Sequence, residues 1–157
     1  MRERSVGLGA MGFHSYLQKN NIAFESMYAS SFNNKAFSLI KDKADLASRR
    51  LAEERGEAPD MKGSKRRNAH LLAVAPNASS SIICGETSPS IEPNRANVYT
   101  HKTLTGSFKV KNKYLDDLLY ELVSTGKKRE EIWKDIAAHE GSVQHLDILS
   151  DEQKEVF

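Results

Sequence analysis

Residues 70–81 decide how the chain is expected to fold. They read His70-Leu71-Leu72-Ala73-Val74-Ala75-Pro76-Asn77-Ala78-Ser79-Ser80-Ser81. The apolar run over 70–75 is too short for a core helix and is typical of a strand buried on both faces of a parallel sheet. Pro76 stops this strand, and a Ser/Asn turn leads into Ile82-Ile83-Cys84, which predicts a junction between a strand and a helix.

This junction is a candidate anion-binding site. Backbone N–H groups are free where a helix starts, the helix dipole favours an anion there, and serine hydroxyls add further donors. Small side chains let a phosphate approach the backbone, and parallel α/β architectures place ligands at the carboxyl ends of strands. A plain helix cap with surface serines is the alternative, and the local pattern leaves both open.

Helical patterns precede the junction. The sequence predicts a helix over 5–18 with small residues on one face, followed by a long amphipathic helix over 30–55 that Gly56 caps. The apolar stripe of the long helix comprises Phe32, Ala36, Leu39, Ile40, Ala44, Ala47 and Leu51.

More helices are expected after the junction. The predicted elements are a loop over 85–97, a half-exposed strand over 108–111, a helix over 112–123 capped by Asn112, a helix over 128–139, and a short helix opened by a capping box at Ser150. The fold class is therefore α/β and rich in helix, with helices over 5–56, the strand and its turn over 70–84, and a strand with helices over 107–157.

The segment Gly7-Leu8-Gly9-Ala10-Met11-Gly12 matches the dinucleotide-binding fingerprint letter for letter. That fingerprint requires a strand before its first glycine and a helix after it. Only six residues precede Gly7, and three of them are charged. We therefore interpret the glycines as positions of close helix packing, with dinucleotide binding as the alternative.

Composition excludes several classes of protein. The net charge of +2, from 23 basic and 21 acidic residues, gives no field that would favour nucleic acid or an anionic membrane. The basic cluster Lys62, Lys65, Arg66 and Arg67 is interpreted as a solvated loop. No apolar run approaches the roughly 18–20 residues of a membrane span, and no signal-peptide core follows the N-terminus. We expect a cytoplasmic protein.

Metal-ligating and nucleophilic side chains are sparse. The single cysteine, Cys84, excludes an internal disulfide and a cysteine-built zinc site, and its apolar neighbours predict a buried, unreactive thiol. The five histidines include no pair at ligand spacing, and His139 and His145 are interpreted as helix-end and loop residues. We therefore expect no metal site.

Four blocks follow one another in the order and spacing of ribonucleotide reductase large subunits. They are Arg67-Asn68, Leu72 to Pro76, Asn77 to Ser81, and Ser88-Pro89-Ser90-Ile91-Glu92-Pro93. These blocks are weak singly and specific together, and the stretch from Arg4 to Gly9 with the long helix after it also looks like the family. The whole chain resembles a segment of the C-terminal barrel of a class I large (α) subunit, of phage or bacterial class Ia type.

The resemblance implies a ten-stranded α/β barrel in which the turn after this strand binds the diphosphate of the substrate. Carried over by position, the substrate-binding residues are Pro76, Asn77, Ala78, Ser79 and Ser80. Ser79 and Ser80 would contribute hydroxyls, and Asn77 and Ala78 mostly backbone groups. The family often has an acidic residue where Ala78 stands, and a Trp and a Gly-Leu that precede Arg-Asn in the family are missing here.

The same resemblance implies chemistry that this chain does not carry alone. Reduction of ribonucleoside diphosphates to deoxyribonucleoside diphosphates needs three cysteines in this family, and the chain has one. The resemblance therefore implies no catalytic residue and no cofactor in this segment. It places a tyrosyl radical and di-iron centre in the small (β) subunit, adds a thioredoxin- or glutaredoxin-type reductant, and places ATP or dNTP effectors elsewhere.

The expected partners are the remainder of the α subunit, the β subunit and a ribonucleoside diphosphate, with no membrane and no direct nucleic acid. The chain is thus expected to be a fragment that exposes apolar surface which other barrel strands would cover. Two alternatives remain open: a degenerate fragment that serves as a protein-interaction module, and a small dinucleotide-binding protein using Gly7 to Gly12.

Overall fold

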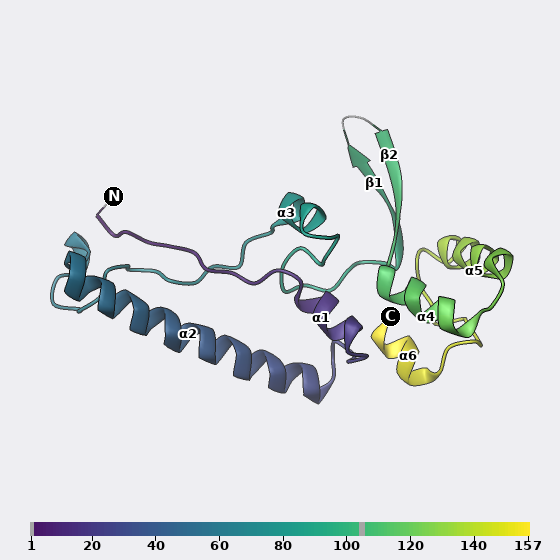
Figure 1. Cartoon of the computed structure of the whole chain (residues 1–157), viewed down its shortest axis with the longest axis horizontal. Helices are drawn as coiled ribbons and strands as arrows, with labels where there is room; N and C mark the ends of the chain where they lie inside the picture. Colours follow the sequence, from purple (N-terminus) through teal and green to yellow (C-terminus); the bar gives the residue numbers. More distant parts are fainter. Residues whose placement is uncertain (1, 104–105) are drawn as a thin grey trace. The chain divides into compact units, whose positions relative to one another are not determined.

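The computed structural model describes residues 2–103 and 106–157. The chain divides into two compact units, whose elements are labelled in Figure 1. Unit 1 comprises Met1–Phe13 and Glu25–Glu92, and unit 2 comprises His14–Phe24 and Pro93–Phe157. Each unit is thus formed by two segments that are separated in the sequence.

The predicted mixture of helix and sheet is confirmed. In chain order the elements are α1 (Phe13–Lys19), α2 (Met27–Arg55), the 3-10 turn η1 (Pro59–Met61), α3 (Ala78–Ile83), β1 (Val98–Thr103), β2 (Gly106–Lys111), α4 (Lys113–Leu122), α5 (Gly126–Ala138) and α6 (Asp151–Val156). None of the helices in the described residues has both the length and the apolar composition that crossing a membrane requires.

Three helices begin or end at the capping residues that the sequence predicts. The Asn112 side chain accepts a hydrogen bond from the Tyr114 N–H at the start of α4. Ser150 and Gln153 form the predicted capping box of α6, and Gly56 ends α2 with φ +79°. These caps satisfy N–H and C=O groups that a helix cannot pair internally.

Unit 1 is built on α2 and two extended segments, one at the N-terminus and one after η1 (Figure 1). Ser48 of α2, only 1% exposed, joins them. Its hydroxyl donates to Asn68 Oδ1 at 3.0 Å and accepts from the Asn68 N–H at 3.0 Å, while Asn68 Nδ2 donates to the Arg4 carbonyl at 2.8 Å. Hydrogen bonds through the Ser48 and Asn68 side chains therefore hold the two extended segments against α2.

The predicted helix over 5–18 is wrong in its first half, because α1 begins only at Phe13. The N–H groups of Val6 and Leu8 donate to the carbonyls of His70 and Leu71 at 3.0 and 2.9 Å. A parallel bridge also joins Leu8 to Leu72. The N-terminal residues thus pair with the 70–75 segment as an extended chain.

The glycines do permit a close approach, but to this extended neighbour and not to a helix. A Cβ at Gly9 would lie 2.4 Å from the Ala73 carbonyl oxygen, and one at Gly7 would lie 2.9 Å from Ala73 Cβ. The glycines therefore lie within the paired strand. A dinucleotide fingerprint would need them in the turn after such a strand.

The predicted strand over 70–75 is present only in part. Leu72 forms the single parallel bridge, and the Leu72 and Val74 side chains are 38% and 70% exposed. The prediction that this strand is buried on both faces is therefore wrong for the described residues, since they supply no second layer over it.

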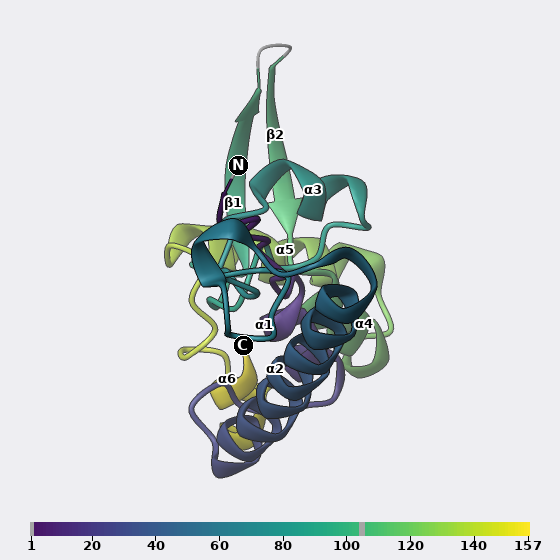
Figure 2. The same cartoon turned by 90° about the vertical axis from the view of Figure 1, so that its left-hand side faces the viewer.

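Unit 2 contains the large apolar core. Its members are Val98, Leu115, Leu119, Trp133, Ile136, Val143, Leu146 and Leu149. The predicted helices over 112–123 and 128–139 are confirmed by α4 and α5, whose Leu115, Leu119 and Ile136 side chains are fully buried. Beside these helices β1 and β2 form an antiparallel hairpin, with Val98 opposite Lys111, that projects away from them (Figures 1 and 2). The sequence predicted part of β2 and missed β1.

Candidate functional site

The turn after the 70–75 segment begins with a left-handed residue. Asn77 has φ +42° and ψ +26°, and its side-chain amide donates to the Ala75 carbonyl at 3.2 Å. Asparagine enters this region more readily than most residues, so the chain can turn sharply there. Helix α3 starts at the next residue, Ala78.

Hydrogen-bond donors at the start of α3 are available to a ligand. Within the described residues, no partner is found for the N–H groups of Ala78, Ser79 and Ser80 or for the hydroxyls of Ser79 and Ser80, and both serines are exposed. Ser81, in contrast, is 4% exposed and its hydroxyl donates to the Ala78 carbonyl at 2.9 Å. The five predicted residues, Pro76 to Ser80, thus form one continuous turn that can present three N–H groups and two hydroxyls to an anion.

The Ser-Pro-Ser block anchors the chain that follows the turn. The main-chain carbonyls of Ser88 and Ser90 accept hydrogen bonds from the N–H groups of Gly12 and Phe13 at 2.8 and 3.2 Å. Gly12 has φ +81°, and a Cβ there would lie 2.5 Å from Thr87 Oγ1. Glycine is therefore required where this block meets the N-terminal segment.

The basic cluster before the turn is engaged in part with α2. Arg66 Nε lies 3.1 Å from Asp45 Oδ1. Arg67 Nη1 donates to the carbonyls of Arg55 and Gly56 at 2.6 and 3.0 Å, which pairs groups that the end of a helix leaves free. These two cations therefore support the fold of unit 1.

The chain matches one family model along its length. The family model described as "Ribonucleotide reductase, barrel domain" matches residues 1–67 and 65–157, which together span the chain. The chain belongs to the ribonucleotide reductase barrel-domain family. The resemblance seen in the four sequence blocks is thus confirmed.

Known ribonucleotide reductases match the chain along nearly its whole length. It is 49% identical over 155 residues to the ribonucleoside-diphosphate reductase large subunit of Invertebrate iridescent virus 3, covering 99% of this chain and 25% of that protein. It is 50% identical over 155 residues to the putative large subunit of Frog virus 3, covering 99% and 27%. The solved Actinobacillus ureae class Id ribonucleotide reductase alpha subunit matches with a TM-score of 0.85 and 46% identity, covering 99% and 28%. The chain therefore spans about a quarter of the length of these relatives and has the fold of part of an α subunit.

The match to ribonucleotide reductases is interrupted at the loop after η1. The two family-model matches meet at residues 65–67. Alignments to relatives that are 28 to 29% identical run over 189 to 201 positions, although the chain has 157 residues. Those relatives therefore carry residues that have no counterpart here.

Sequence reasoning missed a buried amide network in unit 2. Asn97, 4% exposed, donates through Nδ2 to the Gly141 carbonyl at 3.1 Å and to the Phe157 carbonyl. The Asn112 amide donates to Asn97 Oδ1 at 2.8 Å and to Gln18 Oε1 at 3.2 Å. Segments far apart in the sequence are thus joined by amide side chains, which carry no periodic signal.

His14 lies beside this network and lines a cavity of about 430 Å³. Its side chain is buried, its Nδ1 accepts from the Asn94 N–H at 3.1 Å, and its ring packs edge-on against Phe24 at 5.7 Å. Burial lowers the pKa of His14 from 6.5 to about 4, because the surroundings disfavour the charged form. The imidazole is therefore neutral at pH 7.

Lowering the pH is expected to destabilise unit 2 through His14. The unfolded chain binds a proton at His14 near pH 6.5 and the folded chain only near pH 4, so this contribution to stability is complete above pH 6.5 and is lost as the pH falls to about 4. His14→Asn keeps an acceptor for Asn94 and removes the titration. Urea midpoints followed by Trp133 fluorescence should fall less steeply with acid in His14→Asn than in the unaltered chain. Equal slopes in the two proteins would contradict the burial of a neutral imidazole.

One prediction about a single side chain is wrong. Cys84 is a free, exposed thiol at the end of α3, although the sequence predicts that it is buried. His139 and His145 lie at the end of α5 and in the segment after it, as the sequence predicts. Their rings stack with centroids 3.7 Å apart and both contact Asp135, which the sequence did not predict. The signal that could have revealed this cluster is the four-residue spacing of Asp135 and His139, which places both side chains on one face of a helix.

Proposed function

We propose that this chain is the part of a ribonucleoside-diphosphate reductase large subunit that holds the diphosphate of the substrate. The complete subunit would reduce ribonucleoside diphosphates to deoxyribonucleoside diphosphates for DNA synthesis. The observation that carries the proposal is the exposed turn from Pro76 to Ser80, where three N–H groups and two serine hydroxyls have no hydrogen-bond partner in the part of the chain that the structure describes. The names of the viral relatives, both ribonucleoside-diphosphate reductase large subunits, agree with it.

Hydrogen bonds, and not the helix dipole, would supply most of the affinity. Helix α3 has six residues, so its dipole is small. A hydrogen bond to a charged acceptor contributes about 1.5–3 kcal/mol, and the turn offers up to five such donors. Ala78 has a small side chain, which leaves the backbone open to a phosphate oxygen.

The exposed apolar side chains of unit 1 support a place within a larger barrel. Leu8, Val74 and Ile83 are 55%, 70% and 85% exposed. Apolar surface of this kind is typical of an interaction face. We infer that barrel strands from the remainder of the α subunit cover it.

The chemistry of reduction would lie outside this chain. It requires three cysteines, and Cys84 is the single cysteine here. The proposal therefore assigns the tyrosyl radical and di-iron centre to a β subunit, the electrons to a thioredoxin- or glutaredoxin-type reductant, and ATP or dNTP effectors to other parts of the α subunit. A cytoplasmic location and the absence of direct contact with nucleic acid belong to the same proposal.

Exchange of the matching segment tests the proposed function. Residues 1–157 would replace the corresponding stretch of the Actinobacillus ureae alpha subunit, and reduction of a ribonucleoside diphosphate would be measured with that enzyme's own partner components. The proposal predicts an active chimera. A chimera that folds and assembles but has no activity would contradict it and would favour a protein-interaction module.

Removal of the Ser79 and Ser80 hydroxyls should lower the kcat/KM of the chimera for the ribonucleoside diphosphate. Ser79→Ala together with Ser80→Ala is expected to lower kcat/KM by about 100- to 10,000-fold, because each of the two lost hydrogen bonds to a charged phosphate costs about 1.5–3 kcal/mol. The matched control is Ser38→Ala, an exposed serine of α2 in the same unit. Equal kcat/KM values for the double variant and this control would show that the two hydroxyls do not bind the substrate.

A further inference from the structure

The end of α5 carries three side chains with the donor atoms of a transition-metal site. Asp135 lies in the last turn of α5, His139 is the residue that caps the end of this helix, and His145 lies in the segment after it. His139 Nδ1 is 3.3 Å from Asp135 Oδ1, and His145 Nε2 is 2.9 Å from Asp135 Oδ2. One ligand atom from each residue lies within 4.8 Å of the other two. A metal ion about 2 Å from each atom could bind all three once the stacked imidazole rings rotate so that a nitrogen of each points at the ion.

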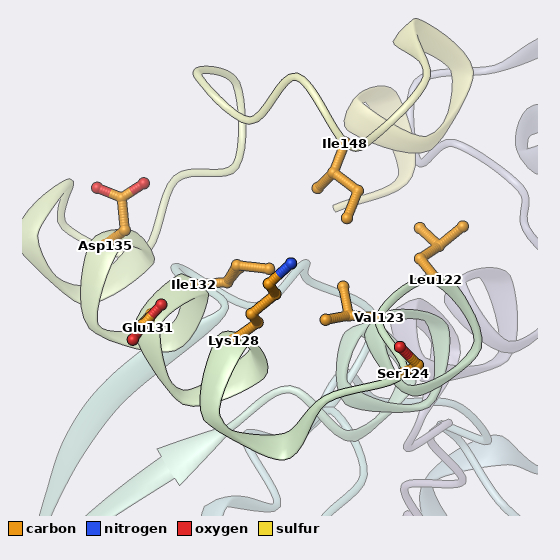
Figure 3. A pocket seen from close by; sticks show the side chains of 8 residues that line it. All are labelled: Leu122, Val123, Ser124, Lys128, Glu131, Ile132, Asp135 and Ile148. Atoms are coloured by element: carbon orange, nitrogen blue, oxygen red, sulfur yellow. The ribbon is translucent and has the colours of Figure 1, made fainter.

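The surroundings leave this cluster accessible. The side chains of Asp135, His139 and His145 are 47%, 51% and 27% exposed. Figure 3 shows Asp135 at the edge of a hollow in unit 2, on the turn of α5 farthest from Leu122 and Val123. An ion can thus reach the cluster from solvent, and three protein ligands would leave one position open to water.

We propose that Asp135, His139 and His145 form a binding site for a divalent transition-metal ion of the Zn²⁺ class. Imidazole nitrogen favours such ions, whereas Mg²⁺ and Ca²⁺ require oxygen ligands that the cluster does not supply in number. The metal ion would take the place of the imidazole–carboxylate contacts of the metal-free chain. The ion would tie the end of α5 to the segment that carries Val143, Leu146 and Leu149 into the core.

Titration of the full chain with Zn²⁺ alone tests the site. After treatment with a chelator, calorimetry should show one saturable equivalent of Zn²⁺, and Mg²⁺ should not compete for it. His139→Gln, His145→Gln and Asp135→Asn should each weaken binding by more than about 100-fold, since loss of a direct ligand should exceed the 10- to 100-fold cost of losing an outer-shell partner. Trp133 fluorescence would verify that each variant keeps the fold of unit 2.

The chain offers a matched control in His70. This exposed histidine also lies near a carboxylate, Glu3 Oε2 at 4.0 Å, but outside the three-residue cluster. His70→Gln should leave Zn²⁺ binding unchanged. On the unaltered chain, Zn²⁺ should shift the imidazole NMR signals of His139 and His145 and leave that of His70 in place. Absence of saturable binding, equal loss in His70→Gln, or unshifted signals at His139 and His145 would each overturn the proposal.

Discussion

Replacement of Trp133 by alanine should destabilise unit 2 by about 3–5 kcal/mol, as for other large aromatic residues removed from a core. The indole is 1% exposed and packs among the apolar side chains of α4 and α5. Its Nε1–H donates to Asp116 Oδ1 at 2.7 Å, and Lys111 Nζ lies 5.2 Å from the ring centroid. Alanine would therefore leave a cavity and remove two polar interactions at once. A loss of this size approaches the whole stability of many domains, which is about 5–15 kcal/mol.

Trp133→Phe separates packing from hydrogen bonding. Phenylalanine keeps most of the apolar contact and loses the N–H donor, so the expected cost is about 1–2 kcal/mol. Urea unfolding followed by far-UV circular dichroism measures both variants, since the fluorescent residue is the one removed. If alanine destabilised the chain no more than phenylalanine does, Trp133 could not be the centre of the core.

Replacement of Gly141 by alanine should cost about 2–4 kcal/mol, from left-handed backbone and steric overlap together. Gly141 has φ +87°, and a Cβ there would lie 2.6 Å from Ala96 Cβ and 3.1 Å from the Val98 carbonyl oxygen. Its own carbonyl accepts from Asn97. Movement of this residue would therefore also disturb the buried amide network.

Gly126→Ala is the matched control within the same unit. Gly126 opens α5, and the nearest atom to an added Cβ is the tip of Arg129 at 3.7 Å. Alanine favours a helix by up to about 1 kcal/mol over glycine, so this variant should be slightly more stable than the parent. Urea midpoints read from Trp133 fluorescence should thus move in opposite directions for the two substitutions. A shift in the same direction and of similar size would contradict the crowding at Gly141.

Sequence reasoning succeeded best where local periodicity and packing agree. In α4 and α5 the apolar residues recur at helical spacing, and the same residues form the core of unit 2. Caps such as Asn112 and Ser150 are read from side chains close in sequence. Strand β1 was missed because its own sequence, Val98 to Thr103, has no regular alternation of apolar and polar residues.

Prediction failed where the structure depends on distant segments. The N-terminal glycines suit a close helix contact or a close strand contact equally well, and only the pairing with His70 and Leu71 distinguishes them. Burial of the 70–75 segment was predicted from its apolar composition, but burial requires a covering layer. The position of the turn from Pro76 to Ser80 was predicted correctly because proline and serine favour turns through their own local conformation and hydrogen bonding. The approach of His145 to Asp135, ten residues away, has no local signal.

Comparison of two ligands in the chimeric subunit tests the central claim most directly. Equilibrium dialysis would measure the affinity for a ribonucleoside diphosphate and for the same nucleoside without phosphate, in the parent chimera and in the variant lacking the Ser79 and Ser80 hydroxyls. If the turn holds the diphosphate, the variant should bind the diphosphate about 100- to 10,000-fold more weakly and bind the nucleoside equally well. Unchanged affinity for the diphosphate, or equal weakening for both ligands, would show that the phosphates are bound elsewhere.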